Sequence, residues 1–358
     1  MSTFQRLEFS QFRNIEKLTL TADPCVNLIF GANGSGKTSI LEAIHLLATG
    51  KSFRSTKTAP LINHVSNELT VFAALAGGVN IGMQKFRNQK PVLKLQGEKQ
   101  PNWVEVARLL PVQVLDSTTF RLLEGSPRER RRFLDWGVFH VEPSFVEHWR
   151  NSRKCLANRN YLLKSNRPDR DQLRAWNAEL AREAEQVDRA RARYFDHFLP
   201  VFTSVLKEIT TLTDLTLQYR RGWDADLGLM DVLSRNESQD IRSGITQNGP
   251  HRADIIVKQG GVAASEVLSR GQQKMLVSAL KLAQGVIQSE TENRRCVFLV
   301  DDLPAELDEA NRGSICRFLQ KMGGQVFLTC VDDSTLKYSL DWEASVTKFH
   351  VEHGKISH

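Results

Sequence analysis

Long apolar runs and paired cysteines are the features that this chain lacks. No apolar run in its 358 residues approaches the roughly 20 residues that a membrane-spanning helix needs, and the N-terminal residues lack the apolar stretch of a signal peptide. The five cysteines are scattered and show no C-x-x-C spacing, and the nine histidines show no metal-ligand spacing. We therefore expect neither a disulfide framework nor a zinc site, and we expect a cytoplasmic protein.

Basic residues outnumber acidic ones, and the excess is uneven. The chain has 48 Lys and Arg against 41 Asp and Glu, a net charge of +7 and a pI of about 9.2, which suits a polyanionic partner without identifying one. Between Lys51 and Leu110 basic residues predominate, in a region where alternation predicts strands and turns. The candidate DNA contacts of this region are Lys85, Arg87, Lys90, Lys94 and Lys99. A solvated basic face remains the alternative.

A nucleotide-binding motif lies near the N-terminus. It fits the P-loop pattern G-x-x-x-x-G-K-[ST] and consists of Gly31, Ala32, Asn33, Gly34, Ser35, Gly36, Lys37 and Thr38, with Ser39 next to it. The apolar run Val26–Phe30 before it predicts a strand, and the spacing of apolar residues after it predicts a helix. We expect Lys37 to reach the β- and γ-phosphates of ATP and the Thr38 hydroxyl to bind Mg²⁺.

Three polar residues flank this strand and helix in the sequence. Arg13, Asn14 and Arg54 are candidate contacts to the nucleotide or its phosphates. Surface salt bridges are an equally good explanation of the two arginines. The sequence leaves both interpretations open.

A second pair of motifs lies near the C-terminus. Leu268-Ser269-Arg270-Gly271-Gln272 is the signature of the ATP-binding-cassette class, and it precedes an apolar run that ends in Asp301-Asp302. In that class the signature contacts the γ-phosphate held by the P-loop of another protomer. We therefore expect Ser269, Gly271 and Gln272 to bind nucleotide across a dimer, near a helix that starts close to Gln272. We expect Asp301 to hold the metal and Asp302 to activate water, as a shorter replacement for the usual glutamate.

Three further assignments are weaker. Gln113 follows a turn signal and is a candidate for the catalytic glutamine of a loop beside the nucleotide. Asp308 is either part of a loop that crosses the dimer interface or a helix N-cap. After the apolar segment Gln325–Leu328, where a switch histidine is usual, the chain has Thr329 and Cys330. Sensing of the γ-phosphate by an imidazole is therefore in doubt.

The long interval between the P-loop and Asp301 predicts an insertion. Residues from Phe145 to about Ile209 have helical periodicity, with turn chemistry at Ser165–Asp169, which indicates an antiparallel helical arm. The expected fold is an α/β ATPase head of the ABC and SMC type with two lobes and this inserted arm. We place the N-terminal part of the head at residues 1–140, the arm at 141–214 and the C-terminal part at 215–358. The arm is much shorter than the coiled coils of SMC proteins.

Taken together, the motifs resemble those of the RecF family of bacterial recombination and replication-repair ATPases. The resemblance also includes Gly50–Arg54, the Arg-rich element Ser126–Trp136 and Gly249–Asp254. It implies an ATP-dependent homodimer with weak, DNA-stimulated hydrolysis acting as a switch, and binding to gapped or junction DNA. It also implies that the protein helps to load recombinase with RecR- and RecO-like mediators.

Two other functional classes share part of this pattern. The ATPase subunit of a membrane transporter has the P-loop and the signature, but the inserted arm, the missing switch histidine and the basic charge argue against it. A small-molecule P-loop kinase does not explain the signature at Leu268–Gln272.

Overall fold

The computed structural model describes residues 3–55, 59–117, 121–165, 168–292, 295–336, 339 and 346–357. The chain forms two compact units: Met1–Thr119 with Ser204–Thr211 and Arg270–His358, and Phe120–Thr203 with Leu212–Ser269. These units do not follow the expected boundaries at residues 140 and 214. The segments 120–140 and 215–269 belong to the same unit as the arm.

The first unit contains an antiparallel sheet with the strand order β2-β1-β4-β5-β6-β7. Its strands are β1 (Phe4–Phe12), β2 (Ile15–Thr21), β4 (Glu68–Leu75), β5 (Asn80–Phe86), β6 (Val92–Leu95) and β7 (Glu98–Gln100). In β4 every second residue is buried, which is the pattern of a strand with one face on the core. The 3-10 turn η1 (Ala59–Leu61) precedes β4.

A second sheet in this unit has the order β15-β14-β3-β13-β12-β8. Its strands are β3 (Val26–Phe30), β8 (Val112–Leu115), β12 (Val297–Val300), β13 (Val326–Cys330), β14 (Val346–Glu352) and β15 (Lys355–Ser357). All neighbours are parallel except the β14–β15 hairpin. β8, β12 and β13 are buried along their whole length, as expected for central parallel strands.

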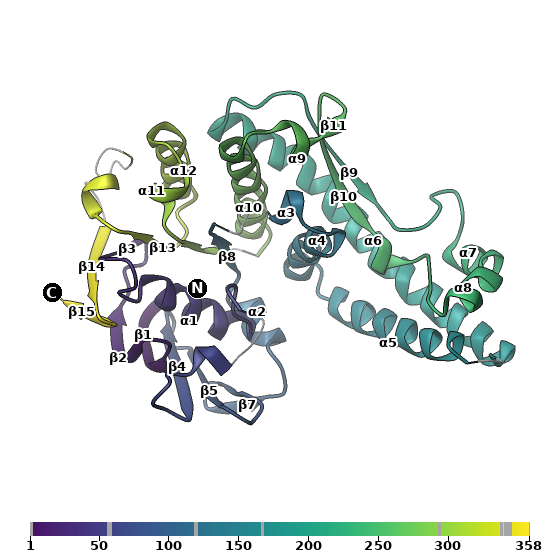
Figure 1. Ribbon diagram of the computed structural model, residues 1–358, viewed down its shortest axis with the longest axis horizontal. Helices are drawn as coiled ribbons and strands as arrows, with labels where there is room; N and C mark the ends of the chain where they lie inside the picture. The colour runs from purple at the N-terminus through teal and green to yellow at the C-terminus, as the bar shows by residue number, and fades with distance from the viewer. Residues whose placement is uncertain are drawn as a thin grey trace. The chain divides into compact units, whose positions relative to one another are not determined.

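Helix α1 (Lys37–Thr49) lies between the two sheets, as Figure 1 shows. Its apolar residues Ile40, Leu41 and Ile44 join one continuous core with side chains of both sheets. The remaining helical elements of this unit are α2 (Val104–Leu109), α10 (Arg270–Glu292), α11 (Leu303–Glu306), α12 (Glu309–Met322) and the 3-10 turn η3 (Asp333–Leu336). Burial of α1 on both sides fixes the P-loop that precedes it.

The second unit combines the helical arm with a small sheet. The arm consists of α5 (Phe145–Leu163) and α6 (Arg170–Ile209), which run side by side (Figure 1). The other elements are α3 (Arg121–Glu124), α4 (Pro127–Val141), α7 (Leu229–Arg235), α8 (Glu237–Ser243), η2 (Pro250–Arg252), α9 (Ala264–Val267) and the antiparallel strands β9 (Leu215–Arg220), β10 (Asp254–Gln259) and β11 (Val262–Ala263). The helices agree with the predicted arm, although Asn166 and Arg167 of the predicted turn lie outside the described residues.

A buried ion pair fixes the arm to the rest of this unit. The Arg159 guanidinium in α5 lies 2.8 Å from Asp240 of α8, and both side chains are completely buried. Arg159 also donates to Asn177 of α6 at 2.6 Å and to the Thr246 hydroxyl at 2.7 Å. A buried charge is tolerated only when it is paired and hydrogen-bonded. The contacts of Arg159 therefore favour one position of α5 relative to α6 and α8.

The Arg-rich and Gly-Pro-His-Arg elements meet inside the second unit. Arg130 of α4 binds both carboxylate oxygens of Asp254, at 2.7 and 3.0 Å, and Arg131 donates to the Ala253 carbonyl at 2.7 Å. Arg191 of α6 pairs with Asp135 of α4 and donates to the Pro250 carbonyl at 2.8 Å. These contacts explain why α4 belongs to the same unit as the arm.

Candidate nucleotide site

The P-loop connects β3 to α1 and has the backbone that its glycines permit. Gly31, Gly34 and Gly36 have φ values of 147°, 80° and 120°, which side-chain-bearing residues rarely adopt. Lys37 is 7% exposed, and its ammonium donates to the carbonyls of Gly31 at 2.6 Å and Ala32 at 2.9 Å. The motif therefore presents an ordered loop and the N-terminus of α1 as an anion site.

The β14–β15 hairpin packs against the P-loop and supports it. The N–H of Gly354 donates to the Ser35 carbonyl at 2.7 Å. A Cβ on Gly31 would lie 2.2 Å from the Val351 carbonyl oxygen, and one on Gly354 would lie 2.5 Å from that of Asn14. The hairpin turn has positive φ at His353 and Gly354, as a two-residue turn with the twist of its strands requires. No motif in the sequence marks this support.

Thr38 and Asp301 come together although they are far apart in the sequence. The Thr38 hydroxyl donates to Asp301 Oδ1 at 2.9 Å, and the Thr329 hydroxyl donates to the same oxygen at 2.8 Å. Burial raises the pKa of Asp301, while these two hydrogen bonds act in the opposite direction. The geometry follows from the order β3-β13-β12, which brings the ends of the P-loop strand and the Asp301 strand to one edge.

The oxygen groups at this edge fit a magnesium ion. Mg²⁺ prefers carboxylate, hydroxyl, water and phosphate oxygens and is usually held by only one or two protein ligands together with phosphates. Thr38 and Asp301 supply one hydroxyl and one carboxylate. Among the described residues, no group of three or more His, Cys, Asp and Glu could hold a metal by itself. In such a site the phosphates of a nucleotide would supply further oxygen ligands.

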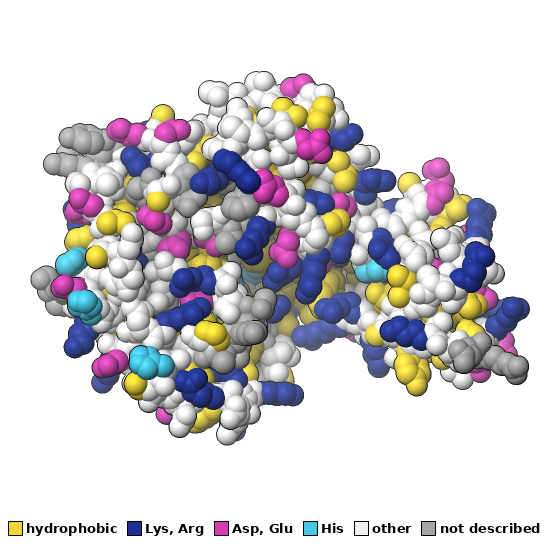
Figure 2. Space-filling model, in the orientation of Figure 1, with side chains coloured by type: hydrophobic (Ala, Val, Ile, Leu, Met, Phe, Trp, Pro, Cys, Tyr) yellow, Lys and Arg dark blue, Asp and Glu magenta, His cyan; other side chains and the backbone are white. Residues whose placement is uncertain are grey.

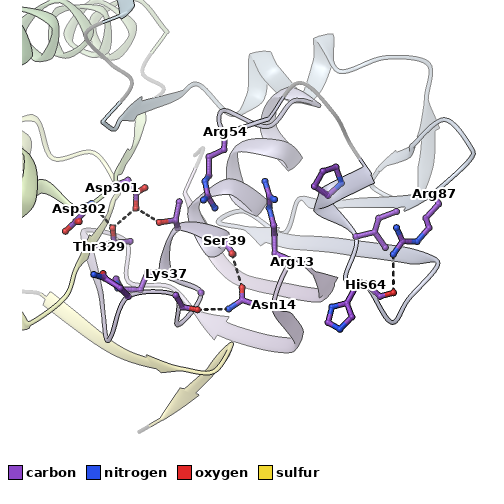
Figure 3. Close-up of a pocket in the computed structure, with 16 residues that line it drawn as sticks. Arg13, Asn14, Lys37, Ser39, Arg54, His64, Arg87, Asp301, Asp302 and Thr329 are labelled. Atoms are coloured by element: carbon purple, nitrogen blue, oxygen red, sulfur yellow. Dashed lines mark hydrogen bonds between the residues drawn. The ribbon is translucent and has the colours of Figure 1, made fainter.

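A cavity of about 970 Å³ opens over the P-loop, large enough for a nucleotide (Figure 3). Its lining residues are Arg13, Asn14, Asn33, Gly34, Gly36, Lys37, Thr38, Ser39, Arg54, Pro60, Ile62, His64, Arg87, Asp301, Asp302 and Thr329. Arg13, Asn14 and Arg54 were candidates from the sequence and lie together here. Pro60, Ile62 and His64 were not identified, and no motif marks them. Arg87, a candidate DNA contact in the sequence, also lines this cavity.

A buried carboxylate connects the two arginines that flank the P-loop. Glu42 of α1 is 0% exposed and accepts hydrogen bonds from Arg13 at 2.7 and 2.8 Å. It also accepts a bond from Ser52 and lies 3.8 Å from the Arg54 guanidinium. The arginines therefore form ion pairs and line the cavity at the same time. Glu42 was not among the residues expected from the sequence; an acidic residue among the apolar positions of a helix marks a buried carboxylate but does not identify its partners.

Asn14 supports the P-loop. Its side-chain amide donates to the Gly34 carbonyl at 3.1 Å and accepts from the Ser39 hydroxyl at 3.0 Å (Figure 3). These bonds join the β1–β2 turn to the middle of the loop and to the first turn of α1. Asn14 can therefore act on a nucleotide through the loop that it holds.

Gln113 lies in strand β8 and is buried, whereas its place in the sequence predicted a loop beside the nucleotide. Its side chain donates to Gln284 of α10 at 2.9 Å, and it does not line the cavity. The ammonium of the neighbouring Lys281 donates to the Val114 carbonyl. Gln113 therefore joins β8 to α10, and among the described residues it is not one of those that line the cavity.

The signature residues are exposed. Ser269, Gly271 and Gln272 are accessible, and nothing lies within 4 Å of a Cβ built on Gly271. Helix α10 begins at Arg270, slightly earlier than expected. Asp308 is the N-cap of α12 and accepts from the Asn311 N–H at 2.9 Å, which confirms the N-cap interpretation.

The basic candidates for DNA binding separate into two groups. Lys85 is 8% exposed and donates to the Gln89 carbonyl, and Arg87 donates to the Ser66 and Asn63 carbonyls at 2.9 Å. Lys90, Lys94 and Lys99 are exposed, and Lys94 faces Lys99 across β6 and β7. Figure 2 shows Lys and Arg side chains spread over both units. Lys85 and Arg87 therefore stabilise their own hairpin and loop.

The comparisons with known proteins identify the family of this chain. The family model described as RecF/RecN/SMC N terminal domain matches residues 3–357. The DNA replication and repair protein RecF of Pseudomonas paraeruginosa is 44% identical over 356 residues, covering 98% of this chain and 96% of that protein. RecF of Pseudomonas entomophila is 42% identical over 359 residues, with 99% and 98% covered.

Solved structures show the same fold. The structure of the recombination mediator protein RecF with ATP, from the RecFOR pathway, aligns with a TM-score of 0.86 at 25% identity, covering 99% of this chain and 97% of that one. The Smc head domain of Pyrococcus furiosus aligns with a TM-score of 0.58 at 15% identity, with 100% and 96% covered.

The fold is thus an ABC- and SMC-type ATPase head with an inserted helical arm. The chain belongs to the RecF/RecN/SMC family and, within it, to the RecF proteins. None of the helices in the described ranges has the length and apolar composition that crossing a membrane requires. The relatives do not favour the transporter alternative.

Proposed function

We propose that this protein is an ATP-switched DNA-binding protein of recombinational repair and replication restart, acting in the cytoplasm. The observation that carries the proposal is the convergence of Lys37, Thr38, Asp301 and Asp302 on one cavity in the first unit. Lys37 would leave its carbonyl partners for the β- and γ-phosphates of ATP. Thr38 and Asp301 would hold Mg²⁺, which supplies charge neutralisation at the phosphates when bound.

Hydrolysis would use Asp302 as the group that orients and deprotonates water. Asp302 is one of the residues that line the cavity, next to Asp301. The exposed signature residues Ser269, Gly271 and Gln272 would contact the γ-phosphate held by a second copy of the chain. ATP would therefore favour a homodimer, and weak hydrolysis stimulated by DNA would release it.

DNA binding is assigned to the exposed lysines of the antiparallel sheet. Lys90, Lys94 and Lys99 are accessible, and the like charges of Lys94 and Lys99 on neighbouring strands would be relieved by a phosphate. By its family, the protein would prefer gapped or junction DNA and would act with RecR- and RecO-like mediators to load recombinase. The RecFOR pathway of its structural neighbour supports this proposal.

Sizing the full-length protein with ATP, with ADP and without nucleotide, each with and without a gapped duplex, tests the proposal. We expect a dimer with ATP, and tighter DNA binding in that state. Lys37→Met should abolish ATP binding and the dimer, because it removes the side-chain cation of the P-loop. A monomer in every condition, or binding of labelled ATP to Lys37→Met with native affinity, would contradict the proposal.

Salt dependence tests the DNA surface separately. Changing Lys90, Lys94 and Lys99 together to Gln should flatten the slope of log K against log salt by about two to three counterions. The control is a variant with Gln at three exposed lysines elsewhere: Lys17, Lys207 and Lys258. A native slope in the variant that lacks Lys90, Lys94 and Lys99 would show that DNA binds to another part of the molecule.

A further inference from the structure

Thr329 connects the two consecutive aspartates of the nucleotide site. It is the fourth residue of β13 and is completely buried. Its hydroxyl donates to Asp301 Oδ1 at 2.8 Å and accepts from the backbone N–H of Asp302 at 2.8 Å. A hydroxyl has one donor and two acceptor positions, so it can make both bonds at once. Figure 3 shows Thr329 between the two aspartates.

The backbone of Asp302 is strained. Its φ of 49° and ψ of 47° lie in the left-handed region, which costs a residue with a side chain about 1–2 kcal/mol. Asp302 is also the N-cap of α11. Strained residues persist when their surroundings hold them in place, and they concentrate at functional sites. The hydrogen bond from the Asp302 N–H to Thr329 is one contact that holds this conformation.

The conformation also bears on the choice of residue. Aspartate and asparagine adopt the left-handed region more often than residues with longer side chains, because the short polar side chain can bond to the local backbone. An aspartate after Asp301, where transporter-type cassettes have a glutamate, therefore fits the backbone found here. An aspartate at position 302 can therefore adopt the left-handed backbone and still supply the carboxylate that would act on water.

We propose that Thr329 is a positioning residue for ATP hydrolysis, which holds Asp302 in the conformation that places its carboxylate at the cavity. This inference rests on the proposed function. The Asp302 carboxylate would take a proton from water while the water oxygen bonds to the γ-phosphorus. The bond from the γ-phosphorus to the β–γ bridging oxygen breaks, its electron pair stays on ADP, and phosphate is released.

The contacts of Asp301 predict which kinetic constant Thr329 controls. Asp301 Oδ1 also accepts from Thr38 at 2.9 Å, so loss of the Thr329 hydroxyl leaves Asp301 with that anchor. The same loss removes the hydrogen bond from the strained Asp302 backbone. Nucleotide binding should therefore be preserved while the hydrolysis step slows.

The test compares Thr329→Val, which keeps the shape and removes the hydroxyl, with Thr329→Ser, which keeps the hydroxyl. In Thr329→Val we expect kcat to fall about ten- to a hundred-fold, the equivalent of one hydrogen bond to a charged or strained site. KM and the affinity for labelled ATP should change less than about three-fold. Thr329→Ser should retain kcat within about three-fold. Thr347→Val is the matched control, because the Thr347 hydroxyl, in β14, bonds to Asp23 and does not line the cavity.

A double-mutant cycle with Asp302→Asn identifies the residue through which Thr329 acts. If Thr329 acts through Asp302, adding Thr329→Val to Asp302→Asn should cause no further loss of kcat. A full additional loss would overturn the inference, as would native kcat in Thr329→Val or a rise in KM with unchanged kcat. Thr329→Ala carries the same comparison should the valine variant melt at a lower temperature. Absence of ATP binding by the native protein would instead refute the proposed function.

Discussion

Glu42 provides a direct test of how the nucleotide site is supported. The substitution Glu42→Gln keeps the size of the side chain and removes its charge. In the native structure the carboxylate is 0% exposed and receives two hydrogen bonds from Arg13 and one from Ser52. The Arg54 guanidinium lies 3.8 Å from it. The variant therefore leaves two guanidinium groups without their buried counter-charge.

The structure sets the expected size of the effect. Removing one partner of a buried ion pair typically costs about 3–5 kcal/mol. Arg13 is 21% exposed and stays partly hydrated, which places the cost at the lower end. The glutamine carbonyl can still accept one hydrogen bond, worth about 1 kcal/mol. We expect the free energy of unfolding to fall by about 2–3 kcal/mol.

Urea denaturation followed by circular dichroism measures this loss. With an m-value of about 3 kcal/mol per molar, the midpoint should fall by about 0.7–1 M. The control is Glu8→Gln, because Glu8 pairs with Arg6 at 2.9 Å on the surface and is 40% exposed. Its loss should change stability by less than about 0.5 kcal/mol. Equal effects of the two substitutions would refute the argument that burial makes the Glu42 contact important.

Three further predictions concern catalysis, assembly and pH. Asp302→Asn should spare ATP binding, reduce hydrolysis to a small but measurable residual rate and prolong the ATP-bound dimer on DNA, whereas Asp301→Asn should weaken binding of Mg²⁺ and with it dimer formation; native hydrolysis in Asp302→Asn would show that Asp302 is not catalytic. Ser269→Arg should bind ATP normally but remain monomeric in sedimentation, and ATP-induced dimers of this variant would contradict a composite site. Burial lowers the pKa of His45 from 6.5 to about 4. Between about pH 6.5 and pH 4 the unfolded chain protonates His45 while the folded chain keeps it neutral, so a fall in pH favours unfolding. The contribution of neutral His45 to the free energy of unfolding is therefore complete above about pH 6.5 and is lost as the pH falls toward 4. His45→Gln should therefore reduce the loss of melting temperature between about pH 7 and pH 5, and an unchanged loss would assign the acid sensitivity to other groups.

The sequence predicts which residues carry the chemistry of the site, but it does not predict the distant segments that hold those residues in place. The P-loop is recognisable because its backbone needs glycine at positions with positive φ. The Asp301 strand is recognisable because a buried parallel strand needs a continuous apolar run. The meeting of Thr38 with Asp301 follows from those motifs. The Glu42 contact and the β14–β15 support depend on which distant segments meet, and local spacing does not encode this.

The charge pattern of the sequence does not show which basic side chains have partners within the chain. Lys85 and Arg87 belong to a basic stretch, but their donors are used by carbonyl groups of nearby turns. The unit boundaries differ from expectation for a similar reason. Arg130 and Arg131 bind Asp254 and the Ala253 carbonyl, which are far away in the sequence. A count of charges cannot distinguish such internal partners from a phosphate.

The order in which the sheet around the P-loop is built has a consequence during protein synthesis. Strand β3 is made early, but its two neighbours, β13 and β14, follow about 300 residues later in the sequence. Gly354, which bonds to the loop, comes later still. A nascent chain therefore contains the complete phosphate-binding motif long before that motif has its sheet. Until translation has passed this hairpin, β3 lacks both of its neighbouring strands and must remain unpaired or protected, whereas β1 and β2 can already pair with β4.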